Sequence, residues 1–387
     1  EPPRPSPLSP TMDVARWRAE FPILARKTYL NSCSLGALSR RSEARVRQFM
    51  DEWHEHGASA WYETWMGRLA ELRGRVGGVL GAGTEEVALV ASVSAGLASV
   101  ASALDYDARP RVVVAELDFP TLAYQWMARP GVEVVRVPSD DGVTIDPARF
   151  ADAVDERTAV LATSHVFFTT GAIQDLPALA EIAHAKGALF LVDAYHGVGQ
   201  MPVDARASGA DVLLCGPLKW LLGGPGLAYL YARRERLAEL VPRLAGWFGA
   251  ADQFSFDIER LAFKEDARRF ELGTPALHAV HSALGGQEII EEVGPAAIRS
   301  RNRMLTERLI EGARAVGLPL RVAEGPERRS AIVMVAEADP AGAVARLAER
   351  GIVVDWRPGF VRVSPHFYNT EDEVDRVLAE LVAWRSR

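Results

Sequence analysis

Short apolar runs alternate with helical stretches between about residues 85 and 235. Each run has the length of a strand, and consecutive side chains are apolar, which is typical of strands covered on both faces. The stretches between them, 95–104, 121–128, 147–153 and 176–186, can form the helices that connect parallel strands. We therefore predict an α/β fold with a mostly parallel sheet of seven strands between helices. The predicted strands are 87–91, 111–116, 132–137, 159–164, 188–192, 212–215 and 227–231.

The pattern changes after about residue 295. A long helical stretch, 295–316, precedes two short β-runs, a helix at 340–350 and a closing helix at 370–385. Thr370 and Glu373 have the spacing of a capping box for the last of these. We predict a smaller, discontinuous α+β domain made of residues 16–45 and 271–387, with a large domain at 46–270. Residues 1–15 are rich in proline and are expected to form a disordered tail.

Charge and composition argue for a small-molecule partner. The net charge is −7 at pH 7, so no basic excess indicates nucleic acid. No run reaches the ~18 apolar residues of a membrane helix, and the N-terminus lacks the apolar region of a signal peptide, so we expect a cytoplasmic protein. Two cysteines form no disulfide framework, and His54 and His56 lack metal spacing, so no metal site is expected.

Two chemically distinctive residues follow neighbouring strands. Asp193 comes directly after run 188–192, and Lys219 comes shortly after run 212–215, before the Gly-Gly-Pro-Gly turn at 223–226. Ligands of such sheets bind beyond the carboxyl ends of the strands. A lysine can form an imine with pyridoxal 5′-phosphate (PLP), and an aspartate can keep the pyridine nitrogen of PLP protonated. The pair predicts PLP as the cofactor, with Lys219 and Asp193 as catalytic residues.

Three further segments at the same edge of the sheet contain residues that could contact PLP. Val93 and Ser94 begin a helix after the first strand, where free amides and the helix dipole favour a phosphate. An ordinary serine cap explains this segment equally well. Phe119 follows the second strand and could stack on the pyridine ring, although a loop aromatic is more often a core residue. His165 follows the fourth strand, although a single histidine is more often structural.

In this order, these segments resemble the class V aminotransferase family of fold-type I PLP enzymes. That family includes kynureninases, cysteine desulfurases and isopenicillin epimerases, and the resemblance covers about residues 29–384. The matching segments are Tyr29 to Gly36, Phe119-Pro120-Thr121, Ser164-His165-Val166 with Thr170-Gly171, Asp193 with His196, Lys219-Trp220-Leu221, Gly246-Trp247-Phe248-Gly249, Gly273-Thr274-Pro275, and Val361 to Pro365.

The resemblance implies a homodimer with shared active sites, in which Trp247 and Thr274 reach the cofactor of the partner subunit. It also implies that Arg362 binds the α-carboxylate of an amino-acid substrate, for which a planar guanidinium is well suited. The full set expected to bind the cofactor is Val93, Ser94, Phe119, His165, Thr170, Asp193, His196, Lys219, Trp247 and Thr274.

Departures from the family pattern affect the expected reaction. Kynureninases carry a tyrosine before the lysine, where this chain has Leu218, and an aspartate where it has Leu122. Desulfurases need a nucleophilic cysteine in a stretch that corresponds to 354–359, which contains none. We therefore expect a PLP enzyme that forms an external aldimine with a small L-α-amino acid, with transamination favoured over kynureninase-like C–C or C–S cleavage. The alternative from another class is a non-catalytic scaffold.

Overall fold

A seven-stranded sheet forms the centre of the molecule, in a computed structural model that describes residues 12–386. Its strand order is β2-β8-β7-β6-β5-β3-β4. Strands β3 to β7 are parallel, and β8 is antiparallel to both of its neighbours. The mostly parallel sheet is confirmed, and each predicted strand is within one residue of the observed bounds. These are β2 Val87–Val90, β3 Arg111–Ala115, β4 Glu133–Val137, β5 Thr158–Ser164, β6 Leu189–Asp193, β7 Val212–Cys215 and β8 Ala228–Ala232.

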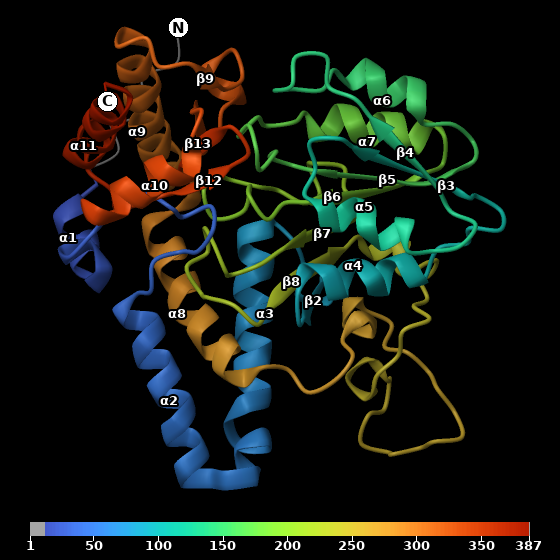
Figure 1. Cartoon of the computed structure of the whole chain (residues 1–387). Helices are drawn as coiled ribbons and strands as arrows, with labels where there is room; N and C mark the ends of the chain where they lie inside the picture. Colours follow the sequence, from blue (N-terminus) through green and yellow to red (C-terminus); the bar gives the residue numbers. More distant parts are fainter. Residues whose placement is uncertain (1–11, 387) are drawn as a thin grey trace, which may run out of the picture.

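Both faces of the sheet are buried, which explains the continuous apolar runs. Along β6, Phe190 and Val192 belong to one core, whereas Leu189 and Leu191 belong to a second core on the opposite face. Figure 1 shows the sheet between α4 and α5 on one side and α6 and α7 on the other. The helices in this part of the molecule are α3 Met66–Leu80, α4 Val93–Ser102, α5 Pro120–Met127, α6 Pro147–Ala153, α7 Leu176–Ala185 and α8 Leu277–Val293.

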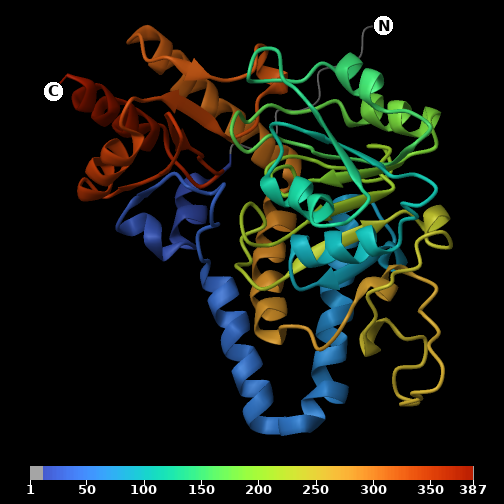
Figure 2. The ribbon, with the colours of Figure 1, turned by 45° about the vertical axis from the view of Figure 1, so that its right-hand side comes forward.

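Helices α2 (Arg40–His56) and α3 form a long hairpin that packs against α8. Figures 1 and 2 show the hairpin and the loop around residues 250–262 extending on the same side of the molecule. Short 3-10 or π turns complete the helical inventory of the described residues: Pro22–Ala25, Gly57–Ser59, Trp61–Trp65, Thr84–Glu86, Arg234–Arg236, Trp247–Gly249, Ala267–Phe270 and Pro326–Arg328.

The C-terminal part forms a four-stranded antiparallel sheet with its own core. Strand β1 (Thr28–Tyr29) pairs with β11 (Ile352–Val353), so the N-terminal segment joins this part of the molecule. Residues 1–11 of the predicted tail lie outside the described residues, and α1 begins at Val14. The remaining elements are α1 Val14–Ala19, β9 Leu320–Arg321, β10 Val333–Ala336, β12 Asp355–Arg357, β13 Phe360–Val363, α9 Pro295–Ala315, α10 Pro340–Glu349 and α11 Glu371–Arg385.

Two local expectations can be compared directly with this structure. Thr370 caps α11, and Glu373 completes the predicted capping box, which is confirmed. Within residues 12–386, every helix is too short or too polar to cross a membrane.

Candidate active site

Lys219 and Asp193 meet at the carboxyl edge of the sheet because their strands are parallel neighbours. Asp193 is the last residue of β6 and pairs in register with Leu214 of β7. Gly216 allows the Tyr195 ring to lie close to the backbone that follows β7, since a Cβ at position 216 would lie 2.6 Å from Cε2 of Tyr195. As a result, the Tyr195 ring packs beside the Lys219 segment, with its centroid 4.8 Å from the Lys219 Nζ.

Burial gives Lys219 the properties of a reactive amine. Desolvation, together with the positive charges of Arg362 and Arg357, lowers its pKa from the ordinary value of 10.5 to about 8. The negative charge of Asp193 opposes this shift without reversing it. Roughly a tenth of the amine is therefore neutral at pH 7, far more than for an ordinary lysine, and only the neutral amine is nucleophilic.

His196 lies directly against Lys219. Its Nε2 is 2.9 Å from the Lys219 Nζ, and its Nδ1 accepts a hydrogen bond of 3.3 Å from the indole Nε1 of Trp220. Because an indole can only donate, the neutral imidazole must carry its proton on Nε2. Burial and the charge of Lys219 place the pKa of His196 well below its usual value, so the ring is neutral. When Lys219 is neutral, the lone pair of its Nζ can accept a hydrogen bond from this Nε2–H.

Asp193 is held with one oxygen bonded and the other available. Its Oδ1 accepts a hydrogen bond of 2.9 Å from the backbone N–H of Tyr195. Its Oδ2 accepts no hydrogen bond from the part of the chain that the structure describes. Burial raises the pKa of Asp193, and the Tyr195 N–H and Lys219 partly offset this effect. A cationic group beside Oδ2 would stabilise the carboxylate strongly.

Two helix N-termini converge beside this pair. Ser92 caps α4 by accepting from Ala95 N, and Ser94 Oγ is 2.8 Å from Thr121 Oγ1 at the start of α5. Phe119, the residue before α5, has its ring centroid 6.0 Å from the Lys219 Nζ. The free amides and hydroxyls of both helix starts can therefore hold an anion near Lys219. Val93, the first residue of α4, lies within this cradle.

Arg362 projects from β13 and is almost fully buried, at 1% exposure. Its Nε and Nη2 donate to the two carboxylate oxygens of Asp355, over 2.8 and 2.6 Å. Its Nη2 also donates to Ser34 Oγ over 2.8 Å, and its Nη1 donates to the carbonyl of Phe168 over 3.1 Å. The Phe168 ring packs edge-on against Phe119. Arg362 therefore connects the small sheet to the Lys219 side of the molecule.

The N-terminal segment is anchored directly to the Lys219 loop. The backbone N–H of Gly36 donates to the carbonyl of Leu218 over 2.9 Å. A Cβ on Gly36 would lie 2.2 Å from the Lys219 carbonyl oxygen, so only glycine permits this contact. The same segment contains Ser34, which explains how it reaches Arg362.

The other predicted residues occupy different surroundings. His165 packs on Gly197, next to His196, and burial lowers its pKa to about 4. Thr170 accepts from Ala172 N in the turn that follows Phe168. Trp247 and Thr274 are exposed, and within residues 12–386 neither forms a hydrogen bond with Lys219 or Asp193.

Several residues of this site were not anticipated from the sequence. Thr121, Tyr195 and Trp220 stood inside recognised motifs, so their position along the chain was a usable signal. Asp355 gave no such signal, since its role depends on the pairing of β12 with β13. The described residues contain no group of three or more metal-ligating side chains, so nothing in them points to a metal site.

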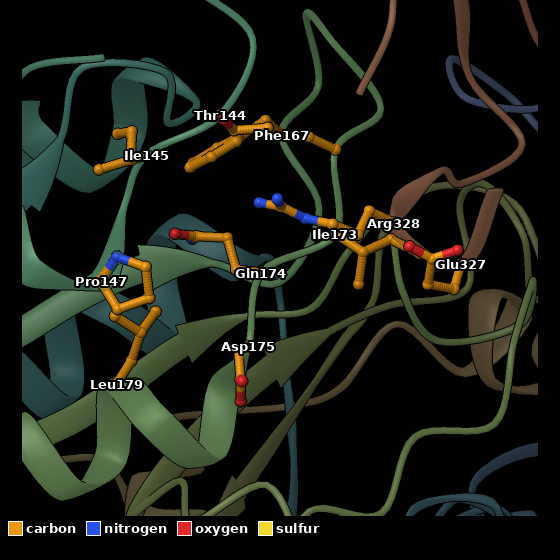
Figure 3. Close-up of a pocket in the computed structure, with 11 residues that line it drawn as sticks. Thr144, Ile145, Pro147, Phe167, Ile173, Gln174, Asp175, Leu179, Glu327 and Arg328 are labelled. Atoms are coloured by element: carbon orange, nitrogen blue, oxygen red, sulfur yellow. The ribbon is translucent and has the colours of Figure 1, made fainter. Parts of the chain in front are cut away.

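A separate cavity of about 410 Å³ contains none of the predicted site residues. Figure 3 shows the Arg328 side chain reaching across it toward Gln174. Gln174 donates from its Nε2 to Thr163 Oγ1 over 2.9 Å and thereby supports the end of β5. The cavity therefore borders the end of β5, the strand that leads to His165. Its lining comprises Thr144, Ile145, Pro147, Phe167, Ala172, Ile173, Gln174, Asp175, Leu179, Glu327 and Arg328.

Comparison with known proteins agrees with this geometry. The Aminotransferase class-V family profile matches residues 44–377. The chain is 32% identical to the uncharacterized aminotransferase YcbU of Bacillus subtilis (strain 168), over 95% of this chain and 97% of the relative. It is also 32% identical to a kynureninase of Deinococcus radiodurans, over 96% of this chain and 93% of the relative.

Solved structures share the fold. The apo cysteine desulfurase of Thermococcus onnurineus NA1 superposes with a TM-score of 0.86 at 21% identity, covering 96% of this chain and 97% of that one. This likeness confirms the fold-type I architecture. With the family profile matching most of its length, the chain belongs to the class V aminotransferase family of PLP-dependent enzymes.

Proposed function

We propose that this protein transfers the amino group of a small L-α-amino acid, with PLP bound at Lys219 as an imine. Arg362 binds the substrate carboxylate, and two chains form the working homodimer. A cytoplasmic location, which the sequence predicts, belongs to the same proposal. The observation that carries it is the buried Lys219 amine, whose pKa of about 8 and contact with neutral His196 suit imine formation.

The residues around Lys219 fit PLP at each of its parts. Oδ2 of Asp193, which accepts no hydrogen bond from residues 12–386, would hold the pyridine nitrogen. The starts of α4 and α5, with Ser94 and Thr121, would hold the phosphate. The Phe119 ring, 46% exposed, offers a flat apolar surface near Lys219 for the pyridine ring. We assign the remaining predicted contacts of His165, Thr170, His196, Val93, Trp247 and Thr274 to the same proposal.

Several side chains of the protein would each have a separate role in the reaction. Bound PLP supplies an electron-withdrawing ring that acidifies the substrate Cα. Once substrate has displaced it, the Lys219 Nζ is a free, neutral amine that accepts the Cα proton. His196 keeps its Nε2–H directed at Nζ, because Trp220 occupies its Nδ1. The Phe119 and Phe168 rings reduce the access of water to the amine.

The cofactor spectrum provides the direct test of transamination. We expect amino acids added to purified holoenzyme, without a keto acid, to convert the bound PLP to pyridoxamine phosphate. Addition of a keto acid should reverse the change. The measurement is absorbance during a screen of L-amino acids, with D-alanine as the control. Release of anthranilate from kynurenine, with no dependence on an amino acceptor, would contradict the proposal.

Kynureninase-like C–C or C–S cleavage is the second candidate, favoured by identities of 27–32% to several kynureninases. Two positions argue against it. Leu218 provides no hydroxyl beside Lys219. Leu122 is fully buried within the core beneath α5, so it offers nothing to a substrate or a phosphate.

The rate of PLP capture should depend on pH with a midpoint near 8. With a pKa of about 8, Lys219 is neutral in roughly a tenth of the molecules at pH 7 and in roughly nine tenths at pH 9. We therefore expect the capture rate of apoprotein to rise about tenfold between pH 7 and pH 9 and then level off. Stopped-flow absorbance after mixing with PLP measures this rate. A rate that still rises about tenfold between pH 8 and pH 9, and levels off only above about pH 11, would indicate a lysine with the ordinary pKa of 10.5.

An exposed apolar surface supports the homodimer. Trp247 stacks on Phe256, and Tyr62 at the tip of the α2–α3 hairpin packs against Phe254. Such a large apolar patch is unusual on a monomer and suits an obligate interface. The patch consists of Tyr62, Trp247, Phe254, Phe256, Ile258 and Leu261, which are 43% to 99% exposed.

Mixing two inactive variants tests the shared site. We expect Lys219→Ala and Thr274→Ala proteins each to have low activity. After unfolding and refolding together, half of the dimers combine both chains, and each of these contains one intact site. About a quarter of wild-type activity should return. Activity that stays at the level of the separate variants would place Thr274 in the same site as its own Lys219.

A further inference from the structure

The pairing of β12 with β13 brings three charged residues to one face of the small sheet. Asp355 lies directly opposite Arg362 in this antiparallel pair. Arg357 is two residues beyond Asp355, so its side chain leaves the same face. This face meets the large domain where Arg362 donates to the Phe168 carbonyl. Arg357 and Arg362 therefore point toward the side of the molecule that contains Lys219.

Arg362 has little donor capacity left. A guanidinium has five N–H donors, and Asp355, Ser34 and Phe168 occupy four of them. The edge of Arg362 that is suited to bidentate binding, formed by Nε and Nη2, already holds the Asp355 carboxylate. With respect to the described part of the chain, one N–H, on Nη1, remains for a substrate carboxylate. A two-point grip on the substrate thus requires another donor nearby.

Arg357 has the free donors that Arg362 lacks. Its Nη1 donates to the carbonyl of the preceding residue, Trp356, over 2.6 Å and lies 3.3 Å from Asp355 Oδ2. Within residues 12–386, its Nε and Nη2 form no hydrogen bond. The side chain is 30% exposed, which leaves it accessible to a small molecule. Its positive charge also contributes to the lowered pKa values of Lys219 and His196, which agrees with its facing the site.

The charges on this face indicate one incoming anion. Arg362, which is buried, and Asp355, which is half-buried, form a neutral pair, and Asp355 contacts Arg357 as well. One positive charge therefore remains, and it belongs mainly to Arg357. One carboxylate would neutralise it, whereas a second substrate anion would leave an uncompensated negative charge.

We propose that Arg357 is a second carboxylate-binding residue, which shares the substrate α-carboxylate with Nη1 of Arg362 while Asp355 fixes the two guanidinium groups relative to each other. The inference rests on the proposed function. It narrows the substrate class to amino acids with a free α-carboxylate and an uncharged side chain.

The test compares variants and substrates that differ in one charge. Arg357→Gln removes the charge, Arg357→Lys retains it, and Arg350→Gln is the control, because Arg350 is exposed on the far end of α10. L-Alanine, L-alaninamide and L-aspartate are titrated into each holoenzyme, and the half-saturating concentration is read from the cofactor spectrum. Binding of propionate to the apoprotein, followed by NMR, provides a readout that does not depend on activity.

We expect Arg357→Gln to raise the half-saturating concentration of L-alanine roughly 10- to 100-fold, with a much smaller change in the limiting rate. Alaninamide should respond less than twofold, because it lacks the carboxylate. Propionate should bind more weakly to the variant by a similar factor. Arg357→Lys should recover part of the loss, and Arg350→Gln should match wild type.

Three results would overturn the inference. Equal L-alanine binding by wild type and Arg357→Gln would remove Arg357 from substrate binding. A loss confined to L-aspartate would assign Arg357 to a side-chain anion instead. Equal losses for alanine and alaninamide would indicate a general structural role. If the wild-type spectrum responds to no amino acid, the proposed function itself fails, and the inference fails with it.

Discussion

Replacing Lys219 with alanine is expected to abolish the cofactor absorbance near ~420 nm that arises from the imine. Turnover should fall by at least ~10³-fold, because the variant loses both the covalent link and the base at Cα. The protein itself should remain folded. Lys219 Nζ makes one side-chain hydrogen bond within the described residues, to His196, and burial opposes its charge. Thermal unfolding and absorbance spectra measure the two consequences separately.

Lys186→Ala is the matched control for this experiment. Lys186 is exposed and pairs with Glu156 on the surface, so its loss should change neither spectrum nor turnover. Methylamine added to the Lys219→Ala protein could restore part of the proton transfer, since it supplies a free amine. An unchanged absorbance band in Lys219→Ala would mean that another amine holds the cofactor, and the assignment of Lys219 would be wrong.

The central sheet was predictable because its burial is simple. The inner strands β5, β6 and β7 of the seven-stranded sheet are covered on both faces. Their sequences are therefore apolar throughout, and the apolar runs end where the strands end. The antiparallel direction of β8 left no trace in the sequence pattern, since a doubly covered strand has the same composition in either direction. The strands of the C-terminal part were harder to predict, because short strands such as β11 and β12 depend on their partners.

The site shows the same division between local and distant information. Asp193 and Lys219 could be placed because each follows a parallel strand, and the edge of the sheet brings them together. The contact of Ser94 with Thr121 required the packing of α4 beside α5. The partners of Arg362 required the register of β12 with β13. Trp247 and Thr274 concern a second chain, so a single chain's sequence could suggest them only through resemblance.

Replacing Asp193 with asparagine is expected to lower kcat by at least ~10²-fold while PLP remains bound. Asparagine has nearly the same shape and can still accept from the Tyr195 N–H through its oxygen. It lacks the negative charge that keeps a pyridine nitrogen protonated, so the ring would withdraw electrons less well. Since the Lys219 imine and the substrate carboxylate site are untouched, KM should change far less than kcat. Steady-state kinetics of the reconstituted variant separate these two effects.

Although Asp193→Asn should lower kcat, it should not lower the stability of the apoprotein. This difference distinguishes a carboxylate needed for function from one needed for folding. Burial raises the pKa of Asp193 in the folded state above its value in the unfolded chain. The unfolded chain therefore loses this proton at lower pH, and the charged carboxylate destabilises the fold increasingly as pH rises through that range. Asp193→Asn removes this cost, so apoprotein at pH 7 should unfold at an equal or higher temperature than wild type. Asp372→Asn, on the exposed start of α11, should leave kcat unchanged and lower the unfolding temperature only slightly, because it removes one carboxylate from the first turn of a helix. A variant that loses activity only because it unfolds at lower temperature would contradict the assignment of Asp193 to the cofactor.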